Sequence, residues 1–213
     1  VSETSIMGYG HPAVTSIAED GFVITWNNSY DVFAQRYNSS MDAVGENFLV
    51  NSVTNLKQED PAITTLADGS FVITWTSPQQ SNQNSKMIYG QRFDASANPM
   101  GAEFQVSQSP TSFSGSNENS SIASLTNGGF VVTFTSSHSR DGSDYGIFAR
   151  LYNSSGEAVR DDFPVNTYTY ANQHESSVIS LKSGGFLVTW DSQYQEGEPY
   201  YDGVYGQWFD DLG

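Results

Sequence analysis

The chain has 213 residues and a formal net charge of −16, from 24 Asp and Glu against only 8 Lys and Arg. Phosphate backbones and anionic bilayers repel so acidic a chain, and we therefore expect neither nucleic-acid binding nor membrane insertion. The absence of cysteine excludes disulfides, thiolate metal sites and a cysteine nucleophile. Because Lys is scarce and Asn, Ser, Thr and Gly are abundant, the composition is typical of exported β proteins. We expect a secreted or cell-surface location.

A fifteen-residue core recurs four times without gaps and organises the chain. It begins at a Pro or Ser and ends on an aromatic residue, spanning 12–26, 61–75, 120–134 and 176–190. Repetition at this period indicates an array of similar structural units. We therefore expect one domain of four repeats, with approximate bounds 12–60, 61–119, 120–175 and 176–213, preceded by an N-terminal segment 1–11.

Each core reads as a β-hairpin. In the first copy, 14–17 and 22–26 alternate apolar and small polar residues around Asp20-Gly21, which supplies the positive φ of a tight turn. The other copies turn at Asp68-Gly69, Asn127-Gly128 and Gly184-Gly185. A third strand is predicted at 32–37, 88–93, 147–152 and 204–209. A short fourth strand is predicted at 47–50, 103–106 and 162–165, and the fourth copy lacks it.

Short antiparallel strands in sets of four, repeated about every 50 residues, are the signature of propeller blades. The predicted fold is therefore all-β: a four-bladed β-propeller with about four antiparallel strands per blade and an incomplete last blade. The small-residue first strand would lie innermost. Three explanations of the incomplete blade stay open: closure through the inner three strands, excision from a longer array of repeats, or a neighbouring chain in a homo-oligomer.

Three motifs in order resemble the repeats of very large secreted bacterial surface proteins, many of which also carry RTX-type calcium-binding repeats. The motifs are Gly-Phe-Val-x-Thr-Trp at 21–26, a Tyr-Gly-Gln-Arg-Phe-Asp strand at 89–94, and Gly-x-x-Phe-x-Val at 101–106. Phe134, Leu151 and Trp208 depart from the pattern. The resemblance implies an exported surface or matrix protein, and it implies no single activity.

Three arginines occupy near-equivalent positions in the third strands: Arg36, Arg92 and Arg150. Together they could clamp a carboxylate-bearing ligand. Repeated positions are explained more simply by repeated structure, in which each Arg pairs with an acid of its own or the next blade. We favour this second interpretation.

The loops between second and third strands carry the candidate sites. In the third copy, Asp141, Ser143 and Asp144 alternate around a glycine, and their oxygens would suit a hard cation such as calcium. An ordinary Asx turn is the alternative. The histidines lack the spacing of zinc ligands and are expected in exposed loops, at His11, His138 and His174.

The fourth copy gathers aromatic and acidic side chains beside a turn. A sugar ring requires an apolar stacking surface with hydrogen-bonding groups around it. The residues predicted to bind carbohydrate are Tyr145, Tyr200, Tyr201, Asp202 and Trp208. The alternative is that Trp208 packs between blades and the tyrosines cover a loop.

No nucleophile-elbow or phosphate-binding motif is present, so the leading hypothesis is a non-enzymatic extracellular binding module. It would be lectin-like or adhesive and would recognise a carbohydrate or glycoprotein through its loops. The second hypothesis is a calcium-stiffened structural repeat of a large surface protein. The third is a glycoside-active propeller, in which loop carboxylates such as Glu196 and Asp202 do acid and base work.

Overall fold

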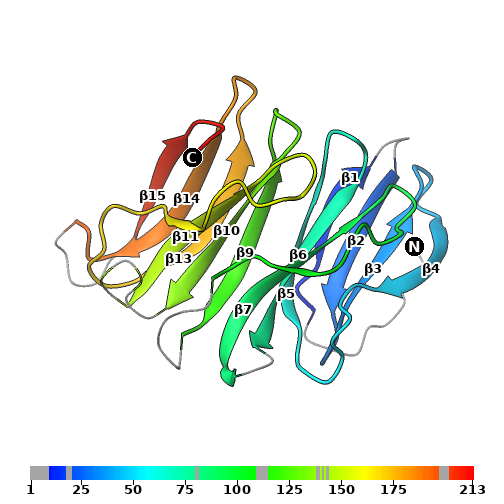
Figure 1. Ribbon diagram of the computed structural model, residues 1–213, viewed down its shortest axis with the longest axis horizontal. Coiled ribbons are helices and arrows are strands. Elements are labelled where there is room, and N and C mark those ends of the chain that lie inside the picture. The colour runs from blue at the N-terminus through cyan, green and yellow to red at the C-terminus, as the bar shows by residue number, and fades with distance from the viewer. Residues whose placement is uncertain are drawn as a thin grey trace.

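The computed structural model describes residues 10–17, 21–79, 82–108, 115–137, 140, 142, 144–196 and 202–213. Within them the chain forms fifteen β-strands in four antiparallel sheets, which stand side by side as blades (Figure 1). None of the described segments forms a helix with the length and hydropathy needed to cross a bilayer.

The strands follow one another in chain order within each blade. Blade 1 contains β1 (Ala13–Ile17), β2 (Gly21–Asn27), β3 (Val32–Tyr37) and β4 (Ala43–Leu49). Blade 2 contains β5 (Glu59–Thr65), β6 (Phe71–Gln79), β7 (Asn82–Phe93) and β8 (Phe104–Gln105). Blade 3 contains β9 (Asn117–Ser124), β10 (Phe130–Ser137), β11 (Tyr145–Tyr152) and β12 (Phe163–Pro164). Blade 4 contains β13 (Gln173–Ser180), β14 (Phe186–Gln193) and β15 (Asp202–Phe209).

The predicted propeller of four blades with an incomplete last blade is confirmed, as are its hairpins. Gly69, Gly128 and Gly184 adopt φ values of +82°, +85° and +92°, the left-handed conformation that the predicted tight turns require. The turn of the first copy, 18–20, lies outside the described residues. The fourth strands differ most from expectation, because β4 is longer than predicted and β8 and β12 have only two residues each.

The first strand of each blade lies innermost, as predicted. β5 contacts both β1 and β9, and β9 also contacts β13, so these strands surround the axis. Their small side chains permit close approach and hydrogen bonds between blades. The hydroxyls of Thr15 and Thr65 lie 3.2 Å apart, and the Ser176 hydroxyl donates to Thr133 Oγ1 at 3.0 Å.

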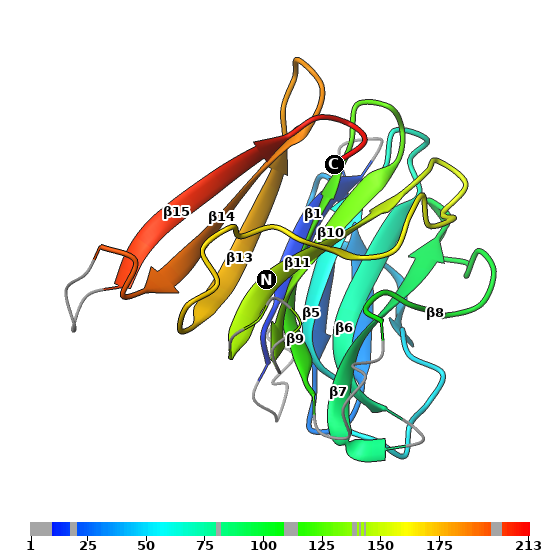
Figure 2. The same ribbon diagram turned by 60° about the vertical axis from the view of Figure 1, so that its left-hand side comes forward.

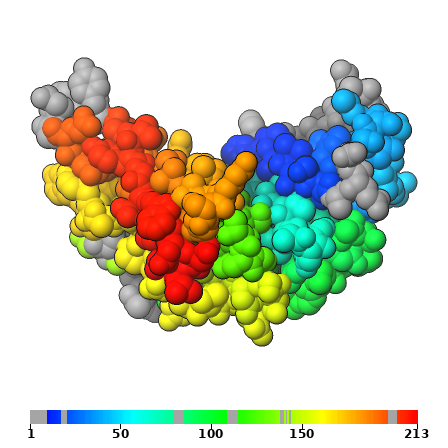
Figure 3. All heavy atoms as spheres, turned by 90° about the horizontal axis from the view of Figure 1, so that it is seen from above, coloured from blue at the N-terminus to red at the C-terminus, as the bar shows by residue number. Residues whose placement is uncertain are grey.

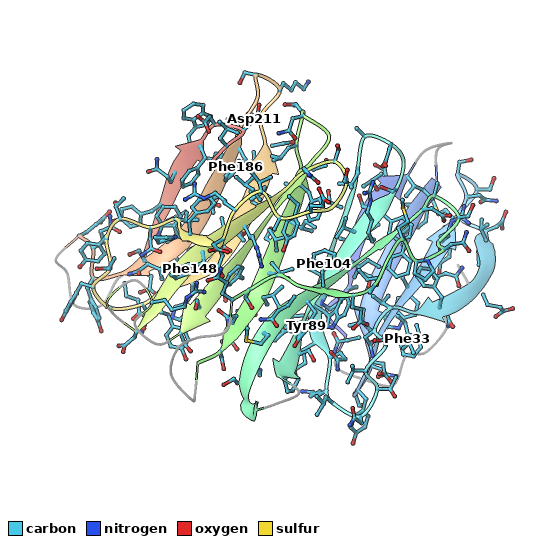
Figure 4. All side chains as sticks on the ribbon, viewed as in Figure 1. Phe33, Tyr89, Phe104, Phe148, Phe186 and Asp211 are labelled. Carbon is cyan, nitrogen blue, oxygen red and sulfur yellow. The ribbon has the colours of Figure 1, made fainter. Side chains whose placement is uncertain are left out.

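Neighbouring blades are held together by apolar packing. Successive sheets lie face to face (Figure 2), and each blade presents an aromatic face to the aliphatic face of the blade before it. Between blades 1 and 2 the contacting residues are Phe71, Ile73 and Trp75 on one side and Val23, Val32 and Ala34 on the other. All six are at most 1% exposed. Phe148 and Phe186 belong to the corresponding clusters farther along (Figure 4).

The four blades form an arc, and the first and last blades lie apart when the molecule is seen from above (Figure 3). Closure through the inner three strands is therefore not observed. The end blades show the consequence: Val204 of blade 4 is 77% exposed, whereas its equivalents Val32, Ile88 and Ile147 are fully buried. On the opposite end, Val14 is 65% exposed. Excision from a longer array and a neighbouring chain stay predictions.

Position in the arc should therefore largely decide the effect of truncation to alanine at equivalent strand positions. Ile147→Ala creates a cavity between blades and should lower the free energy of unfolding by about 2–4 kcal/mol. Val204→Ala at the equivalent exposed position should change it by less than about 0.5 kcal/mol. Urea unfolding measures both. Equal losses would contradict the assignment of Val204 to a free face.

Candidate functional site

Charged side chains gather at one end of the propeller, where the inner strands β1, β5, β9 and β13 begin (the lower edge of Figure 1). We call this end the mouth. Because strands alternate in direction, the loops between second and third strands lie at the same end. The mouth cluster consists of His11, Lys57, Glu59, Asp60, Lys86 and Glu118. Two of the three lysines of the chain belong to it.

A repeated bulge shapes the entry to the inner strands. Asp60, Asn119 and Glu175 occupy the same place in blades 2, 3 and 4, and all adopt left-handed φ values between +51° and +55°. The strand register shifts at each of these places. A bulge bends the strand and redirects its side chains, and non-glycine residues in this conformation concentrate at functional sites. The fold thus offers one reshaped position per blade around the axis.

Glu59 and Glu118, from neighbouring blades, share one cation. Lys86 Nζ lies 3.2 Å from Glu59 Oε2 and 3.7 Å from Glu118 Oε2. Lys57 also pairs with Glu59. The two carboxylate oxygens on Lys86 can therefore be no more than about 7 Å apart.

These contacts control the charge of Glu59. Burial raises the pKa of its carboxyl, but the hydrogen bonds and positive charges of Lys57 and Lys86 outweigh burial and hold the pKa below its usual 4.5. For Lys86, burial lowers the pKa, and the contacts with Glu59 together with the charges of Glu118 and Asp60 raise it above 10.5. Both groups are therefore charged at neutral pH.

A cavity of about 310 Å³ opens beside the cluster, between blades 1 and 2. The contact between His11 Nδ1 and Asp60 Oδ1 crosses this junction. The volume falls in the range of small-ligand sites. The cavity is lined by His11, Asn27, Asn28, Ser29, Lys57, Glu59 and Asp60.

Two buried hydroxyls flank the carboxylates. Thr76 pairs in strand register with Glu59, and Thr135 pairs with Glu118, so each hydroxyl lies on the same side of its sheet as a carboxylate. Both threonines are fully buried, and neither Oγ1 has a hydrogen-bond partner among the described residues. Buried polar atoms of this kind usually require a partner, which a ligand could supply.

The structure separates the residues predicted to bind carbohydrate. Tyr145 begins β11 at the mouth, where its ring lies 4.9 Å from that of His174. Asp202 begins β15 at the same end and is exposed. Trp208 lies six residues farther along β15, roughly 20 Å away, and is 56% exposed. It neither packs between blades nor joins the mouth. Tyr200 and Tyr201 lie outside the described residues.

The predicted calcium site falls largely outside the described part of the chain. Asp141 and Ser143 lie outside it, while Asp144 is exposed at the mouth. His138 is also outside. Among the described residues, no three His, Asp or Glu side chains lie close enough to hold a metal ion. Calcium binding by this loop stays a prediction.

The arginine interpretation is confirmed for one residue and wrong for another. Arg92 Nη2 donates to Asp68 Oδ2 of its own blade at 2.6 Å, and Nη1 donates to the Ser154 carbonyl of blade 3 at 2.9 Å. Arg150 pairs with no acid in the described part of the chain: its Nη1 donates to the carbonyl oxygens of residues 105 and 106, at 3.2 and 2.8 Å. Neither arrangement forms a clamp for a ligand carboxylate.

Sequence reasoning missed the mouth cluster. The one sequence feature that points to this cluster is a polar residue directly before the repeated core in every copy: His11, Asp60, Asn119 and Glu175. The ion pairs themselves join residues 27 and 32 positions apart and leave no motif.

No protein-family model matches the chain, and no curated protein matches it significantly in sequence. Its fold matches solved structures. The endo-arabinase of Bacteroides thetaiotaomicron matches with a TM-score of 0.59 and 12% identity, over 99% of this chain and 78% of that one. The GH93 α-L-arabinofuranosidase of Fusarium graminearum, solved with arabinobiose, matches with a TM-score of 0.67 and 10% identity, over 95% of this chain and 62% of that one. An endo-1,4-β-xylanase of B. thetaiotaomicron matches with a TM-score of 0.57 and 12% identity, over 95% of this chain and 73% of that one. The chain spans between 62% and 78% of the length of these enzymes.

These matches overturn two expectations. The leading hypothesis of a non-enzymatic, lectin-like or adhesive module is wrong on this comparison, and so is the expectation that the chain is not an enzyme, because the matched proteins are glycoside hydrolases. The physical reason for the error is that side chains contributed by different blades meet only in the folded chain. A sequence shows the scaffold and its loops but not that meeting.

The lowered pKa of Glu59 gives a prediction with a definite sign. A carboxylate favoured by the folded state stabilises the protein above its unfolded pKa, near 4.5, and this contribution is lost as the pH falls through the lower folded value. The wild type should therefore lose more unfolding free energy than Glu59→Gln between about pH 5 and pH 3. Denaturant titrations at each pH measure this difference.

The exposed Glu46 of β4 provides the matched control. Glu46→Gln should follow the wild-type curve throughout. Parallel curves for wild type and Glu59→Gln would show that the lysines do not hold the Glu59 carboxylate.

Proposed function

We propose that the chain is a glycoside-active propeller that binds a polysaccharide at its mouth and hydrolyses a glycosidic bond there. The observation that carries this proposal is the pair of carboxylates, Glu59 and Glu118, brought together from neighbouring blades around Lys86. The likeness in fold to an endo-arabinase, an α-L-arabinofuranosidase and a xylanase supports it.

Glycoside hydrolysis commonly uses two carboxyl groups on either side of the scissile bond, separated by roughly 5 to 9.5 Å depending on stereochemistry. The upper limit of about 7 Å between the Lys86-bound oxygens is compatible with that requirement. Glu59 is ionised and suits the nucleophile or base. Glu118, the second carboxyl group beside Lys86, is then the candidate for the other role. This pair replaces Glu196 and Asp202, of which Glu196 accepts a hydrogen bond from the Tyr205 hydroxyl.

The substrate class follows from the mouth and its surroundings. The 310 Å³ cavity is lined by hydroxyl, amide and charged groups, which suit a hydroxyl-rich ligand. Tyr145 and Asp202 begin their strands at the mouth end and stay predicted sugar contacts. Tyr200 and Tyr201, outside the described residues, stay predictions as well. Pentose polymers, the substrates named for the matched enzymes, are the first to test. Secretion and the likeness to RTX-associated repeats stay predictions.

The test is release of reducing ends from arabinan, xylan and arabinoxylan. Glu59→Gln and Glu118→Gln should each lower the rate by at least about 100-fold, because each removes a proton-transfer or nucleophilic group. Glu46→Gln should retain the wild-type rate. Hydrolysis that persists in both mouth variants would assign the activity to other residues, and no hydrolysis of any of the three polymers would refute the proposed substrate class.

Calcium binding is tested separately by thermal melting. If the loop with Asp141, Ser143 and Asp144 binds calcium, a concentration 100 times the dissociation constant should stabilise the fold by about 2.7 kcal/mol. The melting temperature should then rise by several degrees relative to chelator. Asp144→Asn should reduce the shift. Identical melts in calcium and chelator would remove this site.

A further inference from the structure

Two of the three junctions of the propeller, the one between blades 1 and 2 and the one between blades 2 and 3, differ in one side chain at their outer rim. Between blades 2 and 3, Arg150 fills the space between the sheets. Its Nε contacts the carbonyl of Arg160 of its own blade at 3.4 Å, and Nη1 donates to the carbonyls of Gln105 and Val106 of blade 2. The guanidinium also lies over the Tyr152 ring, 5.8 Å from its centroid. Two carbonyls and a ring therefore form a socket for a guanidinium.

The same backbone recurs between blades 1 and 2. By the strand registers, Leu49 and Val50 correspond to the residues at 105 and 106 whose carbonyls accept the hydrogen bonds of the socket, and Phe93 corresponds to Tyr152. The hydrogen bond from the Val50 N–H to the Val32 carbonyl at 2.9 Å repeats that from Val106 to Ile88 at 2.7 Å. The two junctions therefore correspond residue by residue along the main chain.

The side chain that fills the socket is different. Gln91 stands at the place of Arg150, and its Nε2 contacts the carbonyl of Gly101 at 3.4 Å, as Arg150 Nε contacts that of Arg160. Its amide also donates to the Arg92 carbonyl at 2.8 Å. Because Gln91 is shorter than Arg, its side chain ends at these two carbonyls of its own blade. The space beyond its amide is a cavity of about 370 Å³.

The lining of this cavity suits a cation. It includes Leu49, Val50, Gln91, Phe93 and Glu103. Glu103 corresponds to Asp162 of blade 3, which is fully buried and pairs with Arg140 at 2.6 Å. One oxygen of Glu103 accepts the N–H of Ser52, as Asp162 Oδ2 accepts that of Gln108 at 2.9 Å. At the blade 2 and 3 junction, therefore, both a carbonyl pair and a carboxylate bind arginines of the chain itself.

We infer that the cavity between blades 1 and 2 is a binding site for a guanidinium group from outside the chain, held by the Leu49 and Val50 carbonyls, the Phe93 ring and the Glu103 carboxylate. A cation gains charge-assisted hydrogen bonds to the carboxylate and the carbonyls and a favourable contact with the aromatic face. The net charge of −16 adds a general attraction for cations. None of these residues belongs to the mouth cluster, so the site stands apart from the proposed hydrolysis.

Comparison with the junction between blades 2 and 3 suggests the variant that tests this inference most directly. Gln91→Arg copies blade 3 into blade 2, so the new guanidinium should fill the socket from within. Binding of two probes is measured by titration calorimetry: agmatine represents a free small molecule, and N-acetyl-arginine amide represents a peptide side chain. The wild type should bind at least one of them saturably with one site per chain. The tighter of the two identifies the source of the group.

Gln91→Arg should abolish this binding and raise the melting temperature. Glu103→Gln should weaken it about tenfold, since it removes a charged acceptor, while Glu46→Gln on the outer strand β4 should not change it. Arg150→Gln should open the sister socket and add a second site. Absence of saturable binding of both probes at 10 mM, roughly the limit for a useful single-group site, would overturn the inference. So would binding unaffected by both Gln91→Arg and Glu103→Gln.

Discussion

The packing of one blade's aromatic face on the aliphatic face of the blade before it is the interaction on which the rest of the structure depends. Without disulfides, the chain must obtain its stability from these junctions. The burial of the second strands shows the dependence directly. Every residue of β10, which has a blade on either side, is buried, whereas β2 and β14 alternate between buried and half-buried residues because each has only one neighbour. How fully the strands of a blade are buried therefore depends on whether the blade has one neighbour or two.

Sequence predicted the fold well because the required signals are local. Alternating apolar residues, turn glycines and the repeat period each lie within one copy, and all four copies agree. Whether an individual side chain is buried, and what it contacts, depends instead on the neighbouring blade. Trp208 was interpreted as a sugar-stacking or junction residue, yet its strand lies at the free face of blade 4, where nothing in the described part of the chain covers it. The mouth cluster was missed for the same reason, since its ion pairs join different copies.

The repeated bulge explains how a symmetric scaffold supports an asymmetric site. The backbone at the start of the inner strands is nearly the same in blades 2, 3 and 4, with left-handed residues at equivalent places. The side chains there differ, with Glu59 and Asp60 in blade 2 but His174 and Glu175 in blade 4. Because the fold does not require a particular residue at these places, they can diverge without loss of stability. Each junction can therefore carry its own side chains at these places while the same backbone holds the blades together.

The distribution of positive charge also differs between the junctions. The few cations of the chain are concentrated between blades 2 and 3, where Arg92, Arg150 and Lys86 each bind groups across the junction. At the rim between blades 1 and 2 the corresponding residue is the neutral Gln91, and the cavity of about 370 Å³ lies beside it. In so acidic a protein, a junction that its own cations do not fill leaves carbonyl and carboxylate oxygens available to a ligand. The blades pack in the same way at both junctions. Arg150 bonds across the junction of blades 2 and 3, whereas the shorter Gln91 leaves space for a ligand between blades 1 and 2.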